Sequence, residues 1–176
     1  MAAARYGLFS LCGALCGAIL LVSVAFANMA PEKEKLADLQ ARFDRESNAV
    51  HKAKLLTRLS AAQFDETRRL EKLGDFSSVG LLWEKFRDNA RITLTGLKKQ
   101  VRDAERHVGG YRELEIGLRE GIREIDQTML IAPPEYHPPL QLVRDDLSTM
   151  DDEVLRLLFP RRTVDVPPAP ATEKQP

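Results

Sequence analysis

Few side chains of this chain could do chemistry, because the part after residue 27 contains three histidines and no cysteine. His107 follows Asp103 by four residues, so a helix would place an imidazole and a carboxylate on one face, as two ligands for a metal ion. His137 follows Glu135 by two residues in a proline-rich stretch. His51 stands among lysines, which disfavours a bound cation. A histidine near a helix C-terminus also balances the helix dipole, and this explains His107 more simply than metal binding.

The common catalytic patterns are absent from the sequence. It contains no Glu-x-x-His pair of the di-iron type, no His-Glu-x-x-His, no P-loop, no Gly-x-Gly-x-x-Gly and no Gly-x-Ser-x-Gly. The acidic clusters at residues 145–146 and 151–153 lack the loop geometry of a calcium site, and a solvated helix face explains them better. We therefore expect no enzyme, no cofactor and no metal site. A bundle that binds a small ligand or a metal through Asp103, His107 or His137 is the alternative.

Two aromatic positions are candidates for interaction with a partner. Tyr136 and His137 lie within residues 133–139, where two Pro-Pro pairs favour a stiff extended backbone of the kind that often serves recognition. A plain linker that reverses the chain is the competing interpretation. Trp83 is the only tryptophan, and its helical spacing from other apolar residues favours a core position over a binding platform.

The longest apolar stripe of the sequence runs through residues 76–108. Apolar residues recur every third or fourth position with charges between them, which predicts one continuous amphipathic helix of about 50 Å. Gly109 and Gly110 are expected to end it. Because this helix would be longer than its neighbours, one of its ends would be left uncovered, near residues 101–108 or near Trp83. The stripe consists of Val79, Leu82, Trp83, Phe86, Ala90, Leu94, Leu97, Val101, Ala104 and Val108.

A second helical pattern precedes this stripe. It starts at Pro31, weakens over residues 44–48 and resumes with a shifted phase, which predicts a break between helices at about residues 31–46 and 49–73. Ser47 or Asn48 would cap the second helix. The pair Gly74–Asp75 then predicts a short turn that forces the next helix to run antiparallel.

The remaining elements follow the same logic. Residues 111–130 form an amphipathic pattern in which Gly117 and Gly121 indicate a close approach by a neighbouring backbone. Residues 131–139 are expected to be extended, and residues 139–159 to form a helix that Pro160 ends. The Pro-rich tail at 161–176 is expected to be disordered. The fold class is therefore all-α: an antiparallel bundle of four or five long, coiled-coil-like helices in a domain at 28–160.

The expected turn between the first two long helices has a familiar sequence. Residues 71–79 read EKLGDFSSV, and residues 83–85 read WEK. This pattern resembles the hairpin core of a tetratricopeptide repeat, in which a Gly-Asp-Tyr turn joins two helices. The resemblance covers about residues 55–90 and implies protein binding without any residue-level site. No second copy follows at a period near 34 residues, so the likeness is to a single hairpin. The whole chain resembles small exported helical proteins of bacteria, from which no activity can be transferred.

The first residues have the features of a secretory signal peptide. Arg5 is followed by an uncharged apolar run at residues 7–27, which ends in the small-x-small pattern of Ala25 and Ala27. We expect cleavage after Ala27 and an exported, periplasmic or secreted protein. A retained anchor in the inner membrane is the alternative, because about 20 apolar residues can span a bilayer. Both cysteines lie in this segment, so the exported part has no disulfide.

The distribution of charge argues against nucleic acid as a partner. Residues 51–110 carry 13 basic and 8 acidic side chains, whereas residues 111–159 carry 5 basic and 11 acidic ones. Because the two imbalances nearly cancel, we expect the two parts to pair within one molecule. The function that remains is a non-enzymatic exported protein that binds another protein or itself. A membrane is a partner only if the N-terminal segment is uncleaved.

Overall fold

The computed structural model describes residues 30–160, and the side chains of residues 36–160. Five α-helices and one short 3-10 helix make up this part, and it contains no strand, which confirms the all-α prediction. The elements are α2 (Ala30–Arg45), α3 (Ala49–Leu73), α4 (Phe76–Gln100), α5 (Val108–Ile131), η1 (Pro134–Tyr136) and α6 (His137–Leu158). The signal peptide with Ala25 and Ala27, and the tail at 161–176, lie outside the described residues.

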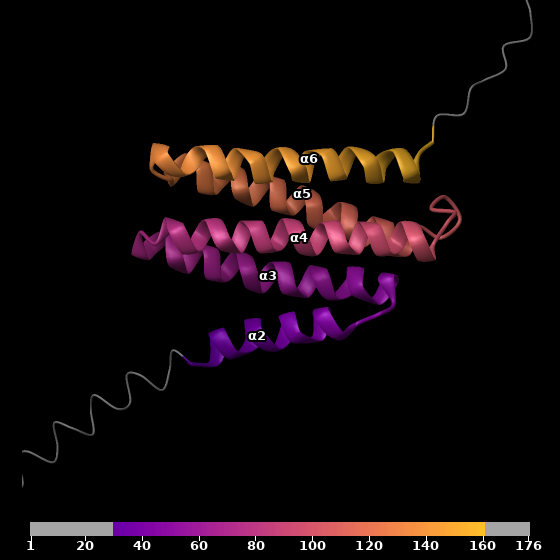
Figure 1. Ribbon diagram of the computed structural model, residues 1–176, viewed down its shortest axis with the longest axis horizontal. Helices are drawn as coiled ribbons and strands as arrows, with labels where there is room; N and C mark the ends of the chain where they lie inside the picture. The colour runs from indigo at the N-terminus through magenta and orange to yellow at the C-terminus, as the bar shows by residue number, and fades with distance from the viewer. Residues whose placement is uncertain (1–29, 161–176) are drawn as a thin grey trace, which may run out of the picture.

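The helices lie side by side as two hairpins and one additional helix (Figure 1). Helices α3 and α4 form one hairpin, α5 and α6 form the other, and α5 packs on α3 while α6 packs on α4. Helix α2 packs on α3, away from the second hairpin. We call the end with Gly74 and η1 the turn end, and the end with residues 101–107 the loop end.

The predicted break in the first helical segment is confirmed. Helix α2 ends at Arg45, and Asn48 caps α3 by accepting a hydrogen bond from the backbone N–H of His51 at 3.0 Å. Gln100 Oε1 accepts a hydrogen bond from the N–H of Ala49 at 2.8 Å. The break therefore occurs where α4 can satisfy a backbone group that would otherwise lack a partner.

The predicted turn between α3 and α4 is also present. Gly74 adopts a φ of 72°, in the left-handed region that glycine reaches without strain. Asp75 then caps α4, because its Oδ1 accepts a hydrogen bond from the N–H of Ser78 at 3.1 Å. This two-residue connection turns α4 back along α3.

The prediction of one continuous helix over residues 76–108 is wrong. Helix α4 ends at Gln100, a loop follows, and Gly110 lies in the first turn of α5 instead of ending a helix. A Cβ at Gly110 would lie 2.6 Å from Leu97 Cδ2 and 3.3 Å from the Cα of Val50, so glycine is there to let three helices meet. The Tyr111 hydroxyl donates to the Val101 carbonyl at 3.0 Å and holds the loop against α5.

This correction removes the expected uncovered helix end. Helices α3 and α4 each have 25 residues and α5 has 24, so their lengths match. Trp83 is 1% exposed, and Ala104 in the loop is buried. The apolar period continued past Gln100 because loop residues also pack on the core.

The prediction of an extended stretch over residues 131–139 is only partly right. Ala132 and Pro133 are extended, but η1 follows at once and α6 begins at His137, two residues before the predicted start. Pro138 and Pro139 sit in the first turn of α6, where a helix needs no backbone N–H donor.

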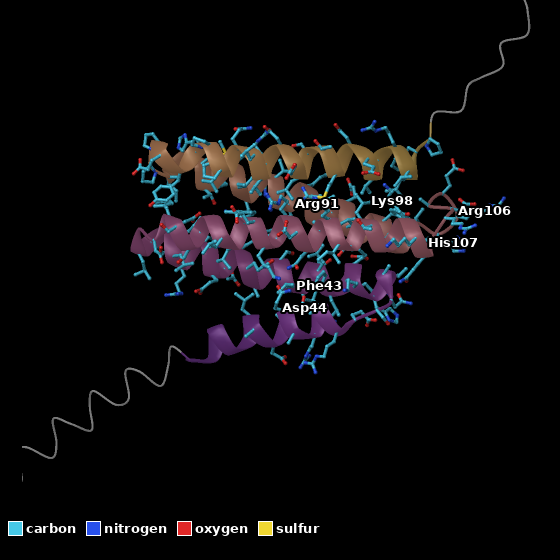
Figure 2. The ribbon with its side chains drawn as sticks, in the orientation of Figure 1. Phe43, Asp44, Arg91, Lys98, Arg106 and His107 are labelled. Atoms are coloured by element: carbon cyan, nitrogen blue, oxygen red, sulfur yellow. The ribbon has the colours of Figure 1, made fainter. Side chains whose placement is uncertain are left out.

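Ion pairs join the basic and acidic parts of the chain, as the charge distribution predicted. Between α4 and α6, Arg91 contacts Asp146 at 2.9 Å and Lys98 contacts Glu153 at 2.5 Å. Figure 2 labels Arg91 and Lys98 along α4. These pairs are exposed, so each stabilises the fold by about 1 kcal/mol or less.

Candidate functional site

Tyr136 and His137, the sequence-predicted interaction residues, lie together at the turn end. The Tyr136 ring packs on Phe76 with the ring centroids 5.8 Å apart, and its hydroxyl lies 3.4 Å from the Ser77 hydroxyl. His137 Nε2 donates to the Ala132 carbonyl at 2.9 Å. Both side chains are half-buried and hold the connection between α5 and α6 against the start of α4.

Trp83 is a core residue of the α3–α4 hairpin. Its ring centroid lies 5.4 Å from that of Phe64 and 6.0 Å from that of Phe86, and these two phenylalanines are 5.3 Å apart. The Trp83 indole nitrogen is buried and finds no hydrogen-bond partner within residues 36–160. Its ring reaches the surface only as part of the lining of a pocket between α3 and α5.

The structure does not place His107 and Asp103 on one helical face. Both lie in the 101–107 loop, where the His107 N–H donates to the Asp103 carbonyl at 3.1 Å. Figure 2 shows His107 and Arg106 at the loop end of the molecule. Among the described residues, no three His, Cys, Asp or Glu side chains gather closely enough to hold a metal ion.

An apolar groove lies at the turn end, between α2 and the α3–α4 hairpin. Its volume is about 410 Å³. Leu36 of α2 forms one side, Leu70 and Leu82 lie opposite, and Leu81 is 67% exposed at the edge. We call it the turn-end groove, and it is lined by Leu36, Glu66, Arg69, Leu70, Asp75, Ser78, Leu81 and Leu82.

Within residues 36–45, the most buried contacts of α2 with the rest of the fold lie near its C-terminus. Phe43, near the C-terminus of α2, is fully buried, and Lys52 Nζ lies 4.8 Å from its ring centroid. One turn earlier, Gln40 exchanges hydrogen bonds with the buried amide of Asn89 on α4, at 3.0 and 3.4 Å. Leu36 and Leu39, earlier in the described part of α2, are half-buried, and α2 diverges from α3 in this direction (Figure 1).

The groove has a fixed negative charge at one edge. Hydrogen bonds from Ser78, first from its side chain and then from its backbone, hold the pKa of Asp75 below its usual value. The Asp75 carboxylate therefore stays ionised at neutral pH. This position favours a partner with a basic residue beside its apolar contact.

Sequence reasoning missed a carboxylate pair between α5 and α6. It predicted a solvated acidic face at residues 151–153, but the Asp151 side chain is only 14% exposed and its Oδ1 has no hydrogen-bond partner within residues 36–160. Burial first, and the nearby charge of Glu115 second, raise the pKa of Asp151. Arg119 Nε lies 4.0 Å away and offsets this only in part.

We expect Asp151→Asn to stabilise the protein at pH 7 by about 0.5 kcal/mol. The pKa of Asp151 is higher in the folded than in the unfolded chain, so folding binds a proton between the two values. Stability therefore falls as pH rises through that window, and the neutral amide removes this fall. Urea unfolding at pH 3.5 and pH 7 measures the difference. Asp152→Asn, at the exposed neighbouring position, is the control, and an Asp151→Asn variant that is less stable at pH 7 would contradict the prediction.

Comparisons with known proteins give this chain no family. No protein-family model matches it, and no curated protein or solved structure matches it either. Within residues 30–160, none of the helices has the length and apolar content that crossing a bilayer requires.

Proposed function

We propose that this chain is an exported, non-enzymatic protein that binds another protein, or a second copy of itself, through the turn-end groove. In this proposal the exported part is an antiparallel bundle of coiled-coil-like helices that serves as an interaction or scaffold component of the cell envelope. The observation that carries the proposal is the apolar groove between α2 and the α3–α4 hairpin, with Leu81 exposed at its edge.

The groove suits an amphipathic helix from the partner. Its walls are leucines on three helices, and apolar grooves between helices commonly accept the apolar face of another helix. Leu73, at the end of α3 in the same hairpin, is also 67% exposed. The resemblance of residues 55–90 to a tetratricopeptide hairpin supports the same class of function.

Leu81→Glu is expected to weaken this association by at least about tenfold, because a charge would have to be buried against leucines. Light scattering after size-exclusion chromatography measures self-association. A photo-crosslinking residue at position 81, introduced in the producing cells, detects a different partner as an adduct of defined mass.

Position 92 provides the matched control. Ile92 is also an exposed apolar residue of α4, at 51%, but it does not line the groove. Ile92→Glu should leave association unchanged, and a crosslinker there should give no adduct. A strict monomer that forms no adduct at position 81 would exclude the proposed function.

The location of the protein in this proposal depends on residues 1–27. Cleavage after Ala27 would release a periplasmic or secreted protein, whereas retention of the apolar run at residues 7–27 would tether it to the inner membrane. Mass spectrometry of the N-terminus of the native protein distinguishes the two. A chain that starts at Asn28 excludes the anchor.

A further inference from the structure

A second pocket lies between α3 and α5, close to the turn end. Its volume is about 340 Å³, within the range of small-molecule sites. Phe64 and Trp83, both almost completely buried, form an aromatic floor, and Ile131 stands exposed at the edge. We call it the α3–α5 pocket. Such a floor favours an apolar or aromatic group of a ligand.

One of its two arginines is already engaged. Arg68 contacts Asp65 at 2.7 Å and Glu124 at 2.5 Å, and these carboxylates raise the pKa of its guanidinium. Arg123 is different, because its side chain is 67% exposed and its ion-pair distances are long, 3.6 Å to Glu120 and 3.9 Å to Glu124. Arg123 is therefore the guanidinium that can pair with a ligand carboxylate.

A carboxylate with spare capacity lies on α3, across the pocket. Glu71 Oε1 accepts a hydrogen bond from the Thr128 hydroxyl at 2.6 Å, but among residues 36–160 the Glu71 carboxylate forms no ion pair within 4.0 Å. Glu71 lies in the last turn of α3, where the dipole of the helix favours a positive charge. A ligand ammonium group placed here would meet both the carboxylate and the negative end of the helix.

These features together specify one class of ligand. We propose that the α3–α5 pocket binds a free apolar α-amino acid, such as leucine or phenylalanine, in its zwitterionic form. The apolar side chain lies on Phe64 and Trp83, the ammonium group pairs with Glu71, and the carboxylate pairs with Arg123. The site is separate from the turn-end groove, so it does not depend on the proposed protein binding.

Calorimetric titration of the purified protein with L-phenylalanine and L-leucine tests this proposal. We expect one site per chain with a Kd below about 1 mM. Phenylalaninamide, which lacks the carboxylate, and 3-phenylpropionate, which lacks the ammonium, should each bind at least about tenfold more weakly, because each loses one charged hydrogen-bonding pair. Fluorescence of Trp83, the only tryptophan, gives a second readout of binding in the same pocket.

Three variants locate the site. Arg123→Gln and Glu71→Gln should each weaken phenylalanine binding by about tenfold or more. Arg119→Gln, one turn earlier on α5 and outside the pocket, should leave binding unchanged. This control shows whether the loss of an exposed arginine elsewhere on α5 also weakens phenylalanine binding. Titrations without heat or fluorescence change up to about 5 mM would overturn the proposal, since a Kd below about 1 mM would be detected there. Binding of phenylalaninamide or of 3-phenylpropionate as tight as that of phenylalanine would also overturn it.

Discussion

Gly121→Ala is expected to destabilise the protein by about 1–3 kcal/mol, the usual cost of forcing extra atoms into a packed core. A Cβ at position 121 would lie 2.3 Å from Phe86 Cε1 and 2.8 Å from Phe86 Cζ. The Phe86 ring cannot turn aside easily, because Phe64 and Trp83 pack against it. Helices α4 and α5 would have to separate around this point.

Gly117 gives a matched control on the same helix. It lies one turn earlier, and an added Cβ there would meet no atom within 4 Å. Gly117→Ala should therefore stabilise the protein by up to about 1 kcal/mol, since alanine favours a helix over glycine. Urea unfolding, followed by Trp83 fluorescence and circular dichroism, measures both variants. If Gly121→Ala were as stable as Gly117→Ala, the close approach of α5 to Phe86 would be wrong.

Phe43→Ala is expected to weaken the docking of α2 by about 3–5 kcal/mol, the usual loss for a fully buried phenylalanine. Helix α2 packs mainly on α3 and buries no other side chain completely within residues 36–45. A loss of this size should release α2 while α3 to α6 remain folded. The turn-end groove would then lose its Leu36 side.

Hydrogen exchange read out by mass spectrometry checks this prediction. In Phe43→Ala, amides of residues 30–45 should exchange much faster, while those in α4 keep their protection. Asp44→Ala is the control, because Asp44 is exposed and its hydrogen bond with Gln40 is a surface contact. Figure 2 labels Phe43 and Asp44 on α2. Equal loss of protection in α2 and α4 would mean that the five helices unfold as one unit.

Most of the fold follows from local sequence signals. The break before Asn48 and the turn at Gly74 were predicted, because a capping side chain and a left-handed glycine act within a few residues. The end of α4 at Gln100 was not predicted. Val101 and Ala104 continue the helical spacing of apolar residues, although they lie in the loop that follows α4 and pack on the core from there. The Tyr111 hydroxyl holds the Val101 carbonyl in the loop that follows the helix, and periodicity does not report a contact of this kind.

The candidate sites were less accessible to sequence reasoning. Trp83 and Tyr136 were singled out as aromatic residues, but the sequence could not tell their roles. Trp83 lines the α3–α5 pocket, and Tyr136 packs the connection between α5 and α6 against Phe76. Glu71 and Thr128 are 57 positions apart, and only the packing of α3 on α5 brings them together. The sequence could not distinguish the half-buried Asp151 from the exposed Asp152, because the burial of a helix position depends on which other helix covers it.

The paired amides of Gln40 and Asn89 restrict how α2 can move. A slide of one turn, about 5.4 Å, would leave the Asn89 amide buried without a partner, which costs about 1–3 kcal/mol. Intermediate registers are therefore unfavourable, and we expect α2 to be either seated on the hairpin or detached from it. A partner that competes for the surface under α2 could bind only while α2 is detached. Its apparent affinity would therefore be its intrinsic affinity multiplied by the fraction of molecules in which α2 is detached.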